Sequence, residues 1–124
     1  MRINISSREL RAARCAFSEA SRPLLDLWDD VKPVQMAAHL LFTNTADHLV
    51  FELEHPEYVH AQAIHLVRKL FDAGLALIDI IEQERRAFGD RPPPALVIAR
   101  GATLTFMETI AQYLSPFASL LRAA

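Results

Sequence analysis

Residues 55–88 decide the fold of this chain and read HPEYVHAQAIHLVRKLFDAGLALIDIIEQERRAF. Apolar residues recur in this stretch at spacings of three and four, which places their side chains on one face of an α-helix. That face consists of Val59, Ala63, Val67, Leu70, Gly74, Leu77, Ile78 and Ile81. The opposite face is marked by Arg68, Asp72, Asp79, Gln83 and Arg86. The pattern predicts one amphipathic helix about 50 Å long, at 1.5 Å per residue.

Gly74 lies near the middle of the apolar face of this predicted helix. Glycine inside a helix costs about 1 kcal/mol relative to alanine, so its presence there calls for a compensating gain. We expect the backbone of another helix to approach closely at Gly74. A ligand pressed against Gly74 is the alternative.

The residues before this stretch predict a second helix that is apolar on nearly every side. Asp29 or Asp30 can cap its start, Pro33 fits its first turn, and it runs to about Leu53. A helix that is apolar all round is normally buried on most sides, and a chain of this length has few helices to cover it. We therefore expect a second molecule to cover part of it. The residues expected at that interface are Met36, Leu40, Phe42, Val50 and Phe51.

The N-terminal part of the chain predicts a further helix. Ser6 and Glu9 have the spacing of a capping box, so this helix should begin after Ser6. Pro23 is expected to end or kink it, and residues 24–28 are then expected to form a short apolar segment over the bundle. One apolar stripe follows the capping box and consists of Leu10, Ala13, Phe17 and Ala20.

The C-terminal part predicts one long helix and one short one. Gly89 is a typical residue just after a helix end, and the prolines at 92–94 form an extended connector. A helix is predicted from about Ala95 to Leu114. Ser115 and Pro116 can then cap and open a last short helix.

Together these elements predict an all-α, four-helix-bundle-like domain that takes in residues 1–124 as a single unit. The connection at 54–56 is short, so we expect the helices on either side of it to form an antiparallel hairpin. The segment at 24–28 and the one after Pro116 are the two predicted accessory helices.

Composition favours a soluble interaction protein over a membrane or secreted one. The chain has 124 residues and is 52% hydrophobic, which is rich for a single small domain. Its longest stretches without a charge, 33–46 and 109–121, are shorter than the roughly 20 apolar residues of a bilayer span. No apolar secretory segment follows Met1, and the single Cys15 cannot form an internal disulfide, so we expect a reducing cytoplasm. Eleven Arg against two Lys suits a GC-rich bacterial genome.

Charge is distributed unevenly along the chain. Residues 1–25 hold five Arg and two Glu, whereas residues 26–58 hold one Lys and seven acids. The basic start lacks the density and interleaved aromatic residues of a nucleic-acid-binding surface. We expect the two segments to pair with each other, within one chain or across a dimer, and we do not expect nucleic acid as a partner.

The strongest polar cluster surrounds the predicted hairpin. His48 and Glu52 are four residues apart, and Glu57 and His60 are three apart. An antiparallel hairpin would bring His48 and His60 to similar depths, where two imidazoles and a carboxylate could bind zinc or iron. The Glu-x-x-His spacing also occurs in di-iron bundles, but those need a second such pair and two further glutamates, and the second pair is missing here. A polar hairpin end without metal is the alternative interpretation.

Catalysis is not expected. The sequence contains no Gly-x-Ser-x-Gly elbow, phosphate-binding glycine loop, Cys-x-x-Cys pair or dinucleotide fingerprint, and it implies no cofactor. Arg100 and Glu108 fall on or near the inward face of the 95–114 helix, where each needs an opposite charge from another helix or from a ligand.

The leading hypothesis is therefore that this chain is a non-enzymatic interaction protein, namely an oligomeric regulator, inhibitor or adaptor. We expect it to form a homo-oligomer, such as a dimer, or to bind another protein. The alternative hypothesis is a bundle that binds a metal or small ligand through His48, Glu52 and His60.

Overall fold

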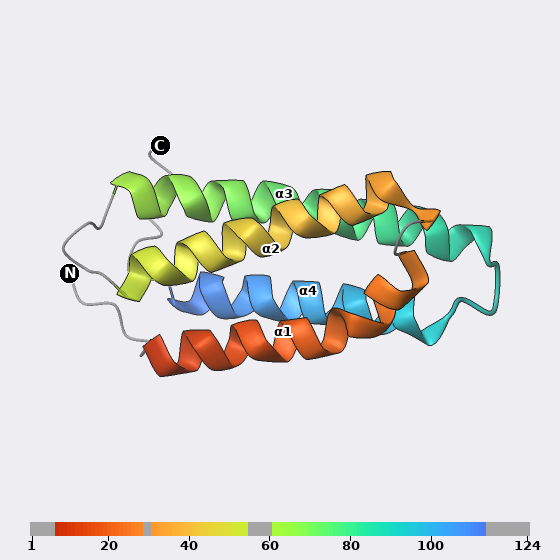
Figure 1. Ribbon diagram of the computed structural model, residues 1–124, viewed down its shortest axis with the longest axis horizontal. Coiled ribbons are helices and arrows are strands. Elements are labelled where there is room, and N and C mark those ends of the chain that lie inside the picture. The colour runs from red at the N-terminus through yellow and green to blue at the C-terminus, as the bar shows by residue number, and fades with distance from the viewer. Residues whose placement is uncertain (1–6, 29–30, 55–60, 114–124) are drawn as a thin grey trace.

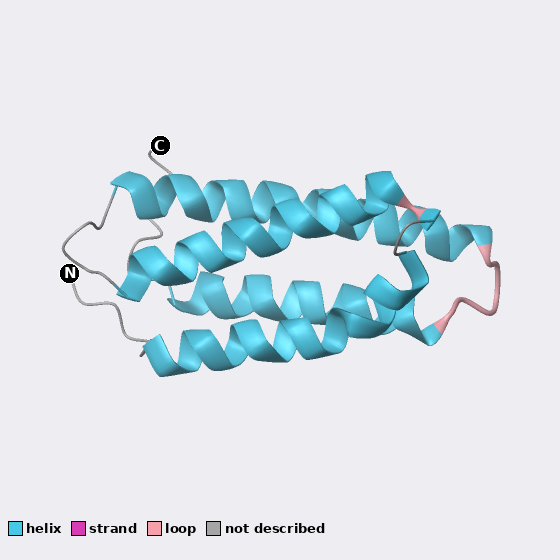
Figure 2. Cartoon of the chain, viewed as in Figure 1, coloured by secondary structure: helices cyan, strands magenta, loops and turns pink. Residues whose placement is uncertain are grey.

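The computed structural model describes residues 7–28, 31–54 and 61–113, and within these ranges the chain is helical without a strand (Figures 1 and 2). The described residues form four helices: α1 (Ser7–Trp28), α2 (Pro33–Glu54), α3 (Ala61–Ala87) and α4 (Pro94–Tyr113). Each helix packs on two neighbours, because contacts link α1 with α4, α2 with α3, α3 with α4 and α1 with α2. The predicted all-α four-helix bundle is confirmed.

The N-terminal helix corrects one prediction. Residues 24–28 do not form a separate accessory helix, since α1 continues through Pro23 to Trp28. Proline lacks the N–H that would bond four residues back and its ring crowds that carbonyl, so it bends a helix when packing holds both sides in place. Figure 1 shows the last turns of α1 angled away from the rest of the helix. Leu24 and Trp28 in these turns are fully buried, which accounts for the continuation.

The end of α3 follows the predicted signal at Gly89, and α4 begins one residue before the predicted Ala95. α3 ends at Ala87, and Gly89 has φ of 65°, the left-handed conformation that glycine adopts without a Cβ clash. The N–H of Gly89 bonds to the carbonyl of Arg86 at 3.1 Å. Pro94 begins α4, where a missing N–H costs nothing because first-turn donors have no partner inside the helix.

The hairpin and the last predicted helix involve residues outside the described ranges. The start of α2 lies beside the end of α3, since Lys32 and Glu84 approach to 3.8 Å. The turn that would join α2 and α3 includes residues 55–60, and the second accessory helix falls within 114–124. Neither segment is described, so the hairpin turn and that helix remain predictions, as does the single-domain boundary.

The centre of the bundle is an aromatic layer contributed by three helices. Phe17 of α1, Phe42 of α2 and Phe106 of α4 have ring centroids 5.1 to 6.0 Å apart in edge-on and tilted arrangements. His39 stacks on Phe17 with centroids 5.8 Å apart. The fourth helix contributes Gly74 near this layer: a Cβ there would lie 3.0 Å from Phe42 and 2.5 Å from the sulfur of Met107. Side chains, and not the backbone predicted above, therefore make the close approach at Gly74.

Candidate functional site

Four large apolar side chains of α2 point out of the bundle. Val34 is 72% exposed, Phe51 54%, Leu40 50% and Leu41 49%. Between Pro33 and Glu54 the helix itself contains no lysine or arginine. Exposed apolar residues gathered on one element are typical of an interaction surface. We call these four residues the outer face of α2.

The predicted interface residues divide between this face and the core. Leu40 and Phe51 belong to the outer face. Phe42 is fully buried and Val50 is 8% exposed, so their own chain shelters both. Met36 is half-buried and packs against the core. Val34 and Leu41 are on the outer face although the sequence pattern did not single them out, because a helix that is apolar in every direction gives no periodic signal.

Two shallow depressions lie between α2 and α3 beside the outer face. In the first, Leu41 packs beside Ala73 and Ala76 of α3, with charged residues such as Arg68 and Asp72 at the rim. In the second, Val34 lies beside Ile80 and Ala87. The apolar surface of α2 therefore continues onto α3 at two places along the bundle.

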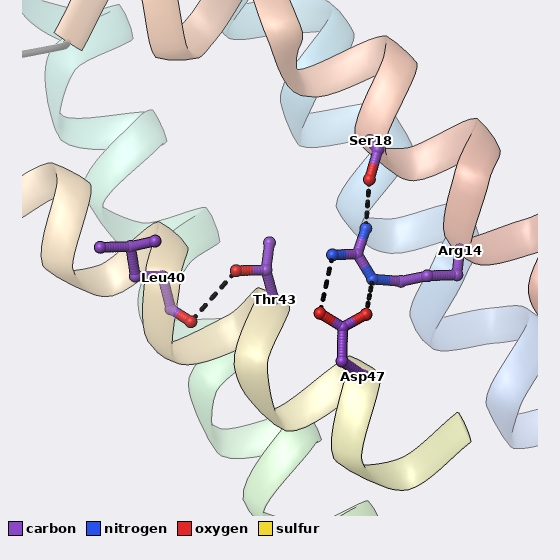
Figure 3. Close-up of polar contacts among 5 residues, drawn as sticks. All are labelled: Arg14, Ser18, Leu40, Thr43 and Asp47. Atoms are coloured by element: carbon purple, nitrogen blue, oxygen red, sulfur yellow. Dashed lines mark hydrogen bonds and ion pairs between the residues drawn. The ribbon is translucent and has the colours of Figure 1, made fainter. Parts of the chain in front are cut away.

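On its other side, the outer face is bordered by an ion pair between α1 and α2 (Figure 3). Arg14 donates from Nε to Oδ1 of Asp47 at 2.7 Å and from Nη2 to Oδ2 at 3.3 Å, and its Nη1 contacts the Ser18 hydroxyl. A two-point contact of this kind fixes both position and orientation. It also neutralises Asp47, an exposed carboxylate of α2.

His39 of α2 is a buried titratable group that the sequence pattern did not single out. It is 4% exposed, and neither ring nitrogen has a hydrogen-bond partner among the described residues. Burial lowers the pKa of His39 below its usual value, and the nearby Arg14 guanidinium lowers that pKa further. His39 is therefore held neutral. The burial of His39 could have been predicted from its spacing, because it lies three residues before Phe42 and seven before Ala46, on the buried side of α2.

A second polar cluster connects the helix ends near the connection from α3 to α4. Arg85 donates to Oε2 of Glu82 at 3.0 Å, and Arg100 lies 2.5 Å from Oε1 of Glu82. The hydrogen bond from Arg85 and the positive charges of Arg85 and Arg100 lower the pKa of Glu82. Arg100 thus finds its opposite charge on α3, while Glu108 is exposed. This cluster joins α3 to α4. Its arginines already pair with the Glu82 carboxylate, which a cationic ligand would otherwise bind.

The predicted metal ligands are described only in part. His48 Nε2 and Glu52 Oε1 are 3.6 Å apart on α2. Glu57 and His60 lie outside the described residues, so the structure does not place the predicted set together. Within residues 7–28, 31–54 and 61–113, no three His, Cys, Asp or Glu side chains are grouped as a metal ion would require.

The buried hydroxyl groups are satisfied locally. Thr43 donates to the Leu40 carbonyl at 3.1 Å (Figure 3), Thr45 to Leu41 at 2.7 Å and Thr103 to Ala99 at 2.8 Å. Bonds of this type to the preceding turn let a threonine be buried without a tertiary partner. These hydroxyls are therefore part of the helices and do not form a nucleophile arrangement.

Comparisons with known proteins identify no relative. No family model, curated protein or solved structure matches this chain. Among the described residues, every helix is too short or too polar to cross a membrane.

Proposed function

We propose that this chain is a non-enzymatic interaction protein that associates with a second copy through the outer face of α2, and that it serves as a regulator, inhibitor or adaptor. One observation supports this most directly: Val34, Leu40, Leu41 and Phe51 are each about half exposed or more. Exposed apolar area on this scale gains free energy at roughly 25 cal/mol per Å² when a partner covers it.

The surroundings of the outer face also support the proposal. Asp47 is already paired with Arg14, so the docking of an apolar partner there does not bury an unpaired charge. The depressions beside Leu41 and Val34 extend the apolar contact onto α3. The cytoplasmic location and bacterial origin expected from the sequence belong to the same proposal, with Cys15 exposed as a reduced thiol.

The test measures molar mass by size-exclusion chromatography with light scattering. We expect a dimer at tens of micromolar for the unchanged chain and a monomer for Leu41→Lys, because the ammonium group would be buried without a partner. Val97→Lys is the matched control, since Val97 is 51% exposed on α4 and outside the outer face. A monomeric unchanged chain at several hundred micromolar would contradict the proposal.

The second candidate function is a metal-binding bundle, which the 3.6 Å approach of His48 and Glu52 favours. We expect Zn²⁺ to raise the melting temperature if these residues bind it, and His48→Ala to abolish the rise. His65→Ala is the control, because His65 is an exposed histidine of α3 that lines the depression beside Leu41. Zinc content below about 0.1 per chain, with no thermal shift, would remove this candidate.

A further inference from the structure

The exposed positions of α2 contain a heptad row. Six exposed residues follow one another along almost the whole helix at alternating spacings of three and four positions. They are Val34, Ala37, Leu41, Asn44, His48 and Phe51. This alternation is the spacing of the a and d positions at which two helices pack knobs into holes. The row extends about 26 Å at 1.5 Å per residue. The row therefore forms a helix-packing seam that α1, α3 and α4, the other described helices, leave exposed.

The seam is polar only in its second half. Asn44 and His48 are its two polar members, and the row contains no carboxylate, lysine or arginine. A seam without charge fits a copy of itself, because identical surfaces that carry a net charge would repel. A polar residue such as Asn within a heptad seam restricts the register and the number of helices that associate.

Charges at the two ends of α2 indicate the direction of the second copy. Lys32 precedes the helix and its side chain is 47% exposed, whereas the last turn contains the acidic residues Glu52 and Glu54. An antiparallel copy would place the lysine end of one α2 beside the acidic end of the other. The helix dipoles would also be opposed, with each positive end near a negative one.

Side-chain sizes favour the same direction. In an antiparallel pair centred between Leu41 and Asn44, Val34 opposes Phe51 of the second copy and Ala37 opposes His48 of the second copy. Each smaller residue then faces a larger one. A parallel pair would instead stack His48 on its own copy and leave a gap between the two Ala37 side chains, which close packing disfavours.

From these observations we infer that two copies of this chain pack α2 against α2 in antiparallel orientation, about a two-fold axis between Leu41 and Asn44. The inference rests on the proposed function and specifies its partner and geometry. A specific interface buries about 800 Å² on each partner, more than one helix row supplies. The depressions at Leu41 and Val34 therefore form part of the contact, and α3 of each copy borders the second α2.

Crosslinking between single cysteines tests the geometry. In a Cys15→Ser background, we prepare Val34→Cys and Phe51→Cys and treat each with a short bismaleimide, separately and after mixing. The antiparallel arrangement predicts a crosslinked heterodimer in the mixture, with at least a fivefold lower yield for either variant by itself. Val97→Cys, on α4, is the control for random collision because its exposure is similar.

The outcomes separate the geometry from the function. If light scattering shows a dimer but Val34→Cys crosslinks efficiently to itself, the antiparallel inference is overturned and the proposed function survives. A dimer that crosslinks no better than Val97→Cys at either position also overturns the inference, because α2 would then lie outside the interface. A monomeric Cys15→Ser chain overturns both.

Discussion

Trp28 and Glu84, 56 positions apart in the chain, are joined by a hydrogen bond of 2.7 Å from the indole Nε1 to Oε2 of the carboxylate. Trp28 is the last residue of α1 and is fully buried, so its N–H has no access to water. Glu84 lies near the end of α3 and also approaches Lys32 to 3.8 Å. One carboxylate thus connects α3 with the end of α1 and with the residue before α2.

We predict that Trp28→Phe lowers the free energy of unfolding by about 2 kcal/mol, since a buried hydrogen bond to a charged group contributes about that much. Glu84→Gln should cost less than Glu84→Leu, because the amide oxygen can still accept the indole proton. Urea unfolding followed by circular dichroism measures all three. Gln83→Ala on the exposed side of α3 is the control. Equal losses for Glu84→Gln and Glu84→Leu would show that the acceptor is unimportant.

The two glycines inside helices should respond in opposite ways to alanine. Gly101→Ala should stabilise the protein by about 0.5 to 1 kcal/mol, because nothing lies within 4 Å of the added methyl group. Gly74→Ala should destabilise it by about 1 kcal/mol, the balance of the same helix gain and an overpacking cost of 1–3 kcal/mol. Thermal unfolding of the two variants side by side measures this difference.

The contact with Met107 should account for most of the Gly74 effect. A Cβ at Gly74 would lie 2.5 Å from Sδ and 3.2 Å from Cε of Met107. In a Met107→Ala background, we expect Gly74→Ala to become neutral or stabilising. If Gly74→Ala remains equally destabilising there, the nearby Phe42 ring is the group that cannot yield.

His39 should make stability depend on pH. Its folded-state pKa is lower than its usual value of 6.5, so below that pH the unfolded chain binds a proton that the folded chain does not. Stability should therefore fall as the pH drops from about 7 to 5, by at most about 1.4 kcal/mol per pH unit from this group. His39→Phe should remove this part of the slope, and it should stabilise the chain at pH 7 by about 1 kcal/mol because two unpaired polar nitrogens are lost.

Urea unfolding at pH 5, 6 and 7 measures the slope. His65→Gln is the matched control, since it also removes one imidazole but from an exposed position on α3. An identical slope in His39→Phe and the unchanged chain would mean that another group titrates between folded and unfolded states.

The Arg14–Asp47 pair should contribute modestly to stability. Arg14 is 17% exposed and Asp47 is 59% exposed, so water screens the pair on one side. A double-mutant cycle with Arg14→Ala and Asp47→Ala should give a coupling of about 0.5–1 kcal/mol. We expect most of this coupling to disappear in 1 M NaCl, where screening acts over about 3 Å. The Gln83–Asp79 contact, which lies within one helix, provides a cycle for comparison.

The sequence by itself determined which segments are helical and where α3 and α4 meet. The three- and four-residue spacing within 55–88 predicted α3, Gly89 marked its end, and α4 begins at Pro94, one residue before the predicted Ala95. These signals are local, because the backbone hydrogen bonds of a helix and its termini depend on residues a few positions apart. At Pro23 the local signal left open whether the helix ends or kinks, and the burial of Leu24 and Trp28 accounts for the continuation of α1 beyond it.

Only the tertiary structure decided which side of α2 faces the core. Apolar residues surround that helix, so the pattern predicted Phe42 and Val50 at an interface, whereas they are buried within the chain, and it passed over Val34 and Leu41. The neighbours of Gly74, the burial of His39 and the partner of Trp28 likewise come from other helices. Their positions depend on how four helices pack, and a uniformly apolar helix can satisfy that packing in several rotations about its axis.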